Sequence, residues 1–127
     1  MVEEALAWAA QRLHAGPVLL YATADAASVR DVQRALGAAR AGELVEACMA
    51  RLASGLVAAG VSQLVVAGGE TSGAVVHALG VRQLRIGPTI DPGLPWTQAE
   101  GRPLLLALKS GNFGSTDFFA KALSKLW

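Results

Sequence analysis

The chain has 127 residues, of which 53% are hydrophobic and 17% charged, and its net charge is +1. This length allows one compact domain with one hydrophobic core, and no apolar stretch approaches the ~20 residues that a membrane-spanning helix needs. A signal peptide is not expected because the N-terminus lacks a basic region followed by an apolar one, and the scattered basic residues argue against a nucleic-acid-binding surface.

The first half of the chain predicts helices around one strand. Residues 2–14 have apolar side chains at helical spacing and are followed by a Gly-Pro stop. The short apolar run at residues 18–21 predicts a strand buried on both faces. A turn that begins within residues 23–30 leads into a short helix ending near Gly37, and residues 43–59 have a strongly helical pattern.

The single cysteine, Cys48, lies on the apolar stripe of that last helix, with Leu44, Leu52 and Leu56. We expect it to pack in the core as an inert side chain. An internal disulfide is excluded, which favours a cytoplasmic protein.

The second half alternates strands with helices. We expect strands at residues 64–67, 83–87 and 103–108, the second of them at a sheet edge, and helices at residues 71–79 and 116–126. Gly80 is placed to cap the first of these helices at its C-terminal end. The segment 88–96 contains three prolines and is expected to be irregular. The alternation predicts an α/β fold, with a mostly parallel sheet flanked by helices in a single domain.

Two glycine-rich loops follow apolar strands, and both are expected to lead into helices. The first contains Gly68 and Gly69, and the second contains Gly111 and Gly114. In a parallel sheet such loops meet at the carboxyl edge, where backbone amides and a helix N-terminus bind anions. We expect both loops at the same edge, with one phosphate-bearing ligand between them. The alternative is that the glycines only turn the chain.

Several polar residues of these loops have two interpretations. Lys109 either contacts a phosphate or extends to solvent, and Glu70 either positions Mg²⁺ through water or favours the helix dipole. Thr71 or Ser72 is a candidate cap for the helix that follows the first loop, and Ser115 or Thr116 for the last helix. Phe113 either flanks a purine or belongs to the core.

Other kinds of site find little support in the sequence. Neither loop has the P-loop or dinucleotide-binding glycine spacing. His14 and His77 are far apart in the chain and have no metal-ligating cluster beside them, so no metal site is predicted from protein side chains. No nucleophile can be identified, and the catalytic residues stay unassigned.

Three motifs in the same order resemble the four-carbon acid sugar kinase family. They are AGGETSGAV at residues 67–75, IDPGLPW at 90–96, and LKSGNFG at 108–114 with DFF at 117–119. The resemblance implies that residues 1–127 form most of the C-terminal nucleotide-binding domain of a kinase that phosphorylates 3-oxo-tetronates and related four-carbon sugar acids. ATP and Mg²⁺ are the implied ligands. The implied ATP-contacting residues are Gly68, Gly69, Glu70, Thr71, Ser72, Lys109, Ser110, Gly111 and Gly114.

The resemblance also implies a partner, the N-terminal sugar-binding domain that holds the sugar acid. That domain has no counterpart in this sequence, so we expect no transfer by the chain alone. We expect a homo-oligomer, with Trp96 and Trp127 as candidate contact points. Two alternatives stay open: a non-catalytic nucleotide- or phosphate-binding interaction module, and an unrelated α/β enzyme acting on a phosphorylated metabolite.

Overall fold

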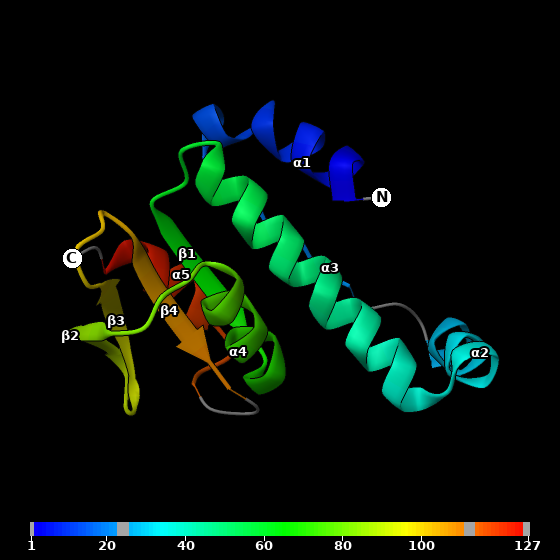
Figure 1. The fold of residues 1–127 in the computed structure, drawn as a ribbon. Coiled ribbons are helices and arrows are strands. Elements are labelled where there is room, and N and C mark those ends of the chain that lie inside the picture. Colours follow the sequence, from blue (N-terminus) through cyan, green and yellow to red (C-terminus); the bar gives the residue numbers. More distant parts are fainter. Residues whose placement is uncertain (1, 23–25, 111–113, 126–127) are drawn as a thin grey trace.

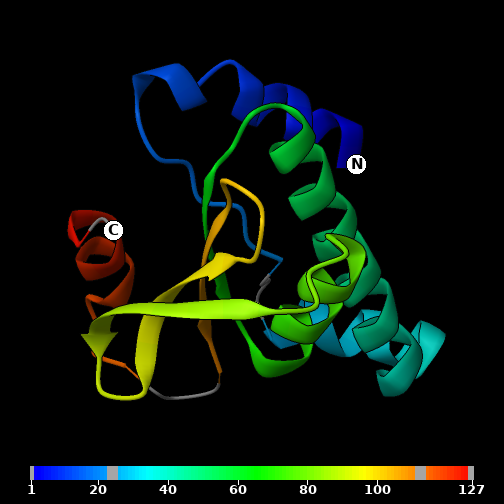
Figure 2. The same ribbon diagram turned by 60° about the vertical axis from the view of Figure 1, so that its left-hand side comes forward.

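The computed structural model describes residues 2–22, 26–110 and 114–125. It contains a four-stranded sheet with helices on both faces (Figure 1; Figure 2). The helices α3 (Ala38–Ala58) and α4 (Gly69–Ala78) cover one face, and α5 (Phe118–Ser124) lies on the other. The prediction of an α/β fold in a single domain is confirmed.

The sheet is mixed, with the strand order β1-β4-β3-β2. The inner pair, β1 (Gln63–Ala67) and β4 (Leu105–Lys109), is parallel, whereas β3 (Leu94–Ala99) runs antiparallel to both β4 and β2 (Leu84–Asp91). The prediction of a mostly parallel sheet is therefore wrong. Parallel neighbours need a long crossover, and the short connections between β2, β3 and β4 permit only antiparallel pairing.

The proline-containing segment forms a β-hairpin, so the prediction that it is irregular is also wrong. Pro92 and Gly93 form the turn between β2 and β3. Gly93 has a φ of +76°, and a proline followed by such a glycine suits a type II turn. The register shifts on both sides of Thr89, which lies opposite Pro95. These irregularities, together with the edge position of β2, allow prolines within paired strands.

Residues 17–22 are not assigned to any strand, which corrects the prediction of a strand buried on both faces. Leu19 is 59% exposed and Tyr21 is 72% exposed, while Val18 and Leu20 are half-buried. The burial therefore alternates along the segment as it would along a strand. An apolar run can predict this conformation, but a strand also needs a neighbour with which to pair.

The predicted helices are present, with shifted ends. α1 (Val2–Ala10) is followed by a 3-10 turn at Leu13–Ala15, and α2 (Ala26–Leu36) by the long α3. Gly80 has a φ of +68°, and its amide donates to the carbonyl of His77, which confirms it as the end of α4.

The predicted side-chain caps are wrong, because the N-cap residues are Gly68 for α4 and Asp117 for α5, and no side chain caps either helix through a hydrogen bond. Along α3, burial increases from the exposed Leu44 to the buried Leu56. Cys48 lies between them and is only half-buried, not fully packed in the core.

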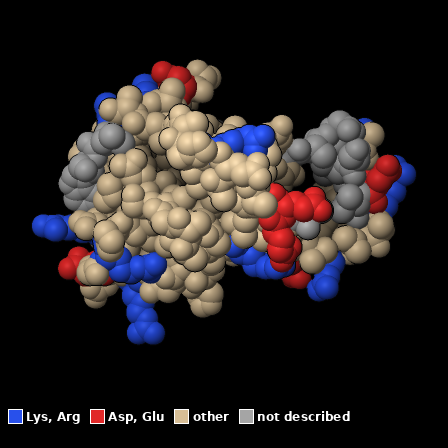
Figure 3. Space-filling model, turned by 90° about the horizontal axis from the view of Figure 1, so that it is seen from above, with Lys and Arg blue, Asp and Glu red and all other residues tan. Residues whose placement is uncertain are grey.

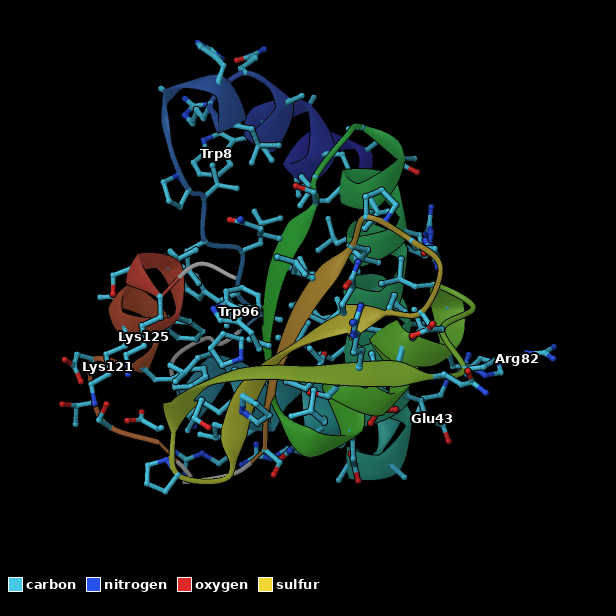
Figure 4. All side chains as sticks on the ribbon, turned by 90° about the vertical axis from the view of Figure 1, so that its left-hand side faces the viewer. Trp8, Glu43, Arg82, Trp96, Lys121 and Lys125 are labelled. Atoms are coloured by element: carbon cyan, nitrogen blue, oxygen red, sulfur yellow. The ribbon has the colours of Figure 1, made fainter. Side chains whose placement is uncertain are left out.

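The core has one layer on each face of the sheet, because successive strand residues point to opposite sides. Leu106 packs toward α3 and α4, and Ala107 packs toward α5. Trp96 is completely buried in the α5 layer, where its indole N–H donates to the carbonyl of Ala122 at 2.9 Å (Figure 4). The prediction of Trp96 as a partner contact is therefore wrong, and Trp127 lies outside the described residues.

Most of the face drawn in Figure 3 is neither acidic nor basic. Lys and Arg are scattered over it and around its outline, whereas several acidic side chains gather in one patch within it. Within the described part of the chain, no helix has both the length and the apolar character needed to cross a bilayer.

Candidate functional site

The two glycine loops begin side by side at one edge of the sheet. β1 and β4 are parallel neighbours, and their last residues, Ala67 and Lys109, are paired in register. The amide of Gly68 donates to the carbonyl of Lys109 at 2.7 Å. The prediction that both loops lie at the same edge is confirmed, and the carboxyl ends of parallel strands are where α/β proteins bind ligands.

The helix α4 starts directly at this edge. Gly68 has a φ of +112°, a conformation that side chains other than glycine rarely adopt, so this position needs a glycine. Its carbonyl accepts the first helical hydrogen bond, from the amide of Ser72 at 2.8 Å. The amides of residues 69–71 have no carbonyl one turn earlier in the helix to bond. Such amides, together with the helix dipole, form a site for an anion.

Gly69 differs from Gly68, because its backbone does not require a glycine. Its φ is outside the positive range, and a Cβ built on it would meet only the Cβ of Ser110, at 3.6 Å, which is an ordinary contact. The first residues of the two loops therefore lie close together. Since neither the turn nor packing explains the glycine, close approach of a ligand to the backbone is the function that its missing side chain suits.

Ser72 has a buried hydroxyl in the first turn of α4. The residue is 8% exposed, and its Oγ has no hydrogen-bond partner within the described part of the chain. An unsatisfied buried hydroxyl costs about 1–3 kcal/mol. Thr71, beside it, lies near Gly68: a Cβ at Gly68 would be 3.3 Å from the Thr71 Oγ1. Two hydroxyl groups thus belong to the turn whose amides have no helical partner.

Glu70 interacts with another carboxyl group on α3. A hydrogen bond with Glu70, burial, and the charges of Glu70 and Glu43 together raise the pKa of Glu46. The side chain of Glu70 thus interacts across the α3–α4 contact. No group of three or more His, Cys, Asp or Glu in residues 2–22, 26–110 and 114–125 is arranged to hold a metal ion.

The second loop contributes a lysine and a serine. Lys109 is half-buried at the end of β4, and Ser110 is exposed. A Cβ on Gly114, whose φ is +89°, would lie 3.5 Å from the Lys109 Cε, so the lysine stem passes the far end of the loop. Gly111 and Phe113 lie outside the described residues, so the structure does not describe the ligand contact predicted for Gly111 or either interpretation of Phe113.

A network that the sequence analysis missed fixes the end of the second loop to the hairpin. The amide and hydroxyl of Ser115 both donate to the Asp91 Oδ2 at 3.1 Å, and the Lys121 Nζ donates to Oδ1 at 2.8 Å. These contacts, the Lys121 hydrogen bond foremost, lower the pKa of Asp91 from 3.8 to about 2. The Asp91 hydrogen bond and charge in turn raise the pKa of Lys121. The Asp-Pro-Gly turn was the only sequence signal for this role.

We expect this network to make stability depend on pH in the acidic range. The folded-state pKa of Asp91 lies below its unfolded value, so its ionised form stabilises the fold above about pH 4 and that contribution disappears as the pH falls toward 2. Asp91→Asn should therefore lower the melting temperature at pH 7, and the difference from the wild type should shrink between pH 4 and pH 2. Melting curves across this range test it. Parallel curves for the two proteins would show that the carboxylate charge does not stabilise the fold.

The family of the chain follows from a comparison with known protein domains. A family model described as a nucleotide-binding C-terminal domain matches residues 1–119. The chain belongs to this family. The match includes the carboxyl ends of β1 and β4, the helix α4 and the entire second glycine loop.

Relatives of known name and structure agree with this assignment. The chain is 58% identical to a 3-oxo-tetronate kinase of Cupriavidus necator and 59% identical to one of Pseudomonas fluorescens, each over 99% of this chain and 29% of the relative. A crystal structure of a Haemophilus influenzae protein superposes with a TM-score of 0.88 at 37% identity, over 99% of this chain and 31% of that one. The chain thus spans less than a third of the length of these relatives.

Proposed function

We propose that this chain binds ATP between the Gly68–Ser72 and Lys109–Gly114 loops, as the nucleotide-binding domain of a cytoplasmic kinase for four-carbon sugar acids such as 3-oxo-tetronates. The observation that carries the proposal is the 2.7 Å hydrogen bond between Gly68 and Lys109, which joins the two loops at the ends of parallel strands. Family membership supplies the nucleotide, and the names of the relatives supply the substrate class.

The residues at this edge suit a triphosphate. The first-turn amides of α4 would bind phosphate oxygens, and the absence of a side chain at Gly69 would let them approach. The Ser72 hydroxyl, which has no partner in the described part of the chain, and the Thr71 hydroxyl are further donors on the same turn. Lys109 and Ser110 would contact the phosphates from the second loop, together with the backbone of Gly111 and Gly114.

Mg²⁺ would enter with the nucleotide. This ion keeps several waters and is usually bound through substrate phosphates and one or two carboxylates. The phosphates of ATP would therefore supply most of its protein-independent ligands. Glu70 would hold the Mg²⁺ ion through water. A divalent cation there would also stabilise the negative charge on the neighbouring carboxyl groups of Glu70 and Glu46.

The sugar acid and the catalytic groups would come from the remaining part of a full-length kinase. Phosphoryl transfer requires the acceptor hydroxyl to be positioned in line with the γ-phosphate. In the kinase relatives, the part of the chain outside the matched segment is more than twice as long as the matched segment itself. We place the sugar-binding domain in that additional chain.

A titration of the wild type and Gly69→Ala with ATP and Mg²⁺ by calorimetry tests the proposal. The new methyl group meets only an ordinary contact with Ser110, and alanine favours helices by up to about 1 kcal/mol over glycine, so the melting temperature should stay the same or rise. The methyl group would obstruct the phosphate, and ATP affinity should fall about tenfold or more, which corresponds to about 1.4 kcal/mol.

Gly42→Ala is the matched control, because Gly42 is also helical and a Cβ there would meet nothing within 4 Å. It should leave ATP affinity unchanged. Equal affinities for ATP in all three proteins would contradict the proposed site. Tripolyphosphate that binds as tightly as ATP would favour the phosphate-binding module instead of a nucleotide site.

A further inference from the structure

An apolar cavity of about 610 Å³ lies along the free side of β1. All five residues of β1 line it, and so do all residues of the extended segment 17–22. Two extended pieces of chain thus contribute to its walls. The helix α3 contributes Val45, Met49, Leu52, Ala53 and Leu56, and the helix α5 contributes Phe119 and Leu123.

The backbone of β1 is available for pairing on that side. The strand is at the end of the sheet and pairs only with β4 among the described strands. The carbonyl of Ser62 accepts from Leu105, and the amide of Gly68 donates to Lys109, so the even-numbered residues direct their backbone groups toward β4. Because the direction alternates along a strand, the amides and carbonyls of Gln63, Val65 and Ala67 face the cavity.

Both faces of the cavity are covered by helices. α3 lies on one side of the sheet plane and α5 on the other, and both contribute to its lining (Figure 2). A segment of chain that continues the sheet beyond β1 would therefore lie between two apolar layers of helices, as β4 does. The segment 17–22 is itself extended, with burial that alternates over residues 17–21, where Leu19 and Tyr21 are exposed.

We propose that a single β-strand fills this cavity, pairing with β1 on one side and with residues 17–22 on the other. The strand would belong to the additional chain that a full-length kinase of this family carries, since the relatives exceed the matched region by about 70% of their length. Its side chains would be apolar on both faces, as is usual for buried inner strands. This inference rests on family membership and the sheet edge, and it does not depend on ATP binding.

The shape of the cavity favours an inserted strand over a second copy of this chain. Edge-to-edge pairing of two sheets requires each free edge to be accessible. Here the free edge of β1 borders a cavity that residues 17–22, α3 and α5 also line, so a lone extended segment suits it better than the edge of a second sheet. The homo-oligomer expected from the sequence would have to use another surface.

Amide hydrogen exchange, measured by NMR on the 127-residue chain, tests whether the free edge of β1 is unpaired in this chain alone. The amides of Val65 and Ala67 should exchange about tenfold or more faster than those of Leu64 and Val66, which bond to β4. If all four amides were equally protected at every protein concentration, residues 17–22 would close onto β1 without another strand. If the protection of Val65 and Ala67 increased with protein concentration, a second copy of the chain would fill the cavity. Either result would overturn the proposal.

A chimera, in which this chain replaces the matched segment of the Cupriavidus necator kinase, tests whether the additional chain of a full-length kinase supplies the strand. The Val65 and Ala67 amides should then exchange as slowly as those of Leu64 and Val66. A folded chimera in which they still exchange fast would refute the inserted strand. Should the chimera not fold, the intact Cupriavidus kinase is measured at the aligned positions, with the same two outcomes.

Leu19→Glu gives a second readout, with Ile86→Glu as its matched control. Both residues are exposed in the chain alone, at 59% and 69%, but only Leu19 lines the cavity. Leu19→Glu should lower the melting temperature by about 4 °C or more in the chimera and little in the chain alone. Ile86→Glu should have similar small effects in both. Equal effects of Leu19→Glu in the two proteins would contradict the proposal.

Discussion

Trp96→Ala is expected to destabilise the fold by about 3–5 kcal/mol, the usual cost of truncating a buried aromatic side chain. Trp96 is completely buried with Ile90 and Phe118 in the α5 layer, and its N–H donates to the Ala122 carbonyl at 2.9 Å. Truncation would leave a cavity and remove the hydrogen bond to the Ala122 carbonyl. Because whole domains have only about 5–15 kcal/mol of stability, much of the chain should unfold at 37 °C.

Urea unfolding followed by circular dichroism measures this loss, with Trp8→Ala as the control. Trp8 is 41% exposed, and the guanidinium of Arg12 lies 4.6 Å from its ring centre. An exposed cation–π contact contributes about 0.5–1 kcal/mol. A smaller loss for Trp96→Ala than for Trp8→Ala would show that the α5 layer is not an essential part of the core.

Trp96→Phe separates packing from hydrogen bonding. The phenyl ring retains most of the buried apolar area but cannot donate to Ala122. We expect a loss of stability smaller than that of Trp96→Ala, because only the hydrogen bond to Ala122 and a small part of the apolar area are removed. A loss as large as that of Trp96→Ala would indicate that the hydrogen bond, and not the ring, attaches α5 to the sheet.

The glycine loops were the part of the site that could be predicted from local sequence. An apolar run followed by glycines and a small-residue helix determines where a strand ends and a helix begins, and it placed both loops at one edge. Which first-turn residue caps the helix could not be predicted, because Gly68 itself is the capping residue. That neither the backbone nor packing requires a glycine at position 69 could be recognised only from the space around it.

The errors arose where pairing depends on distant residues. The rule that prolines interrupt strands holds for regular ladders, but the Pro92–Gly93 turn and the shifted register around Thr89 allow a hairpin. The apolar run at residues 18–21 has the composition of a strand, yet it forms none within the described structure because no neighbour pairs with it. The Asp91 network joins residues 24 and 30 positions apart, a separation that gives no periodic signal.

The isolated chain is expected to show no measurable phosphorylation of a four-carbon sugar acid, whereas the chimera with the Cupriavidus relative should be active. Holding two reactants in line can supply about 7–11 kcal/mol of the barrier, and the proposed site holds only the nucleotide. Loss of that contribution alone corresponds to a rate at least about 10⁵-fold lower.

Coupled assays of ADP release, with and without the sugar acid, measure this difference on both proteins at equal concentration. ATP bound to the isolated chain would face water, so any slow ADP release should not increase with the sugar acid. Gly69→Ala in the chimera should lower kcat/KM about tenfold or more through its effect on ATP binding. Sugar-dependent turnover by the isolated chain within tenfold of the chimera would place the acceptor site within these 127 residues. A folded chimera that binds ATP but transfers nothing would favour the interaction module, because the positioning that a kinase requires would then be absent even with the additional chain in place.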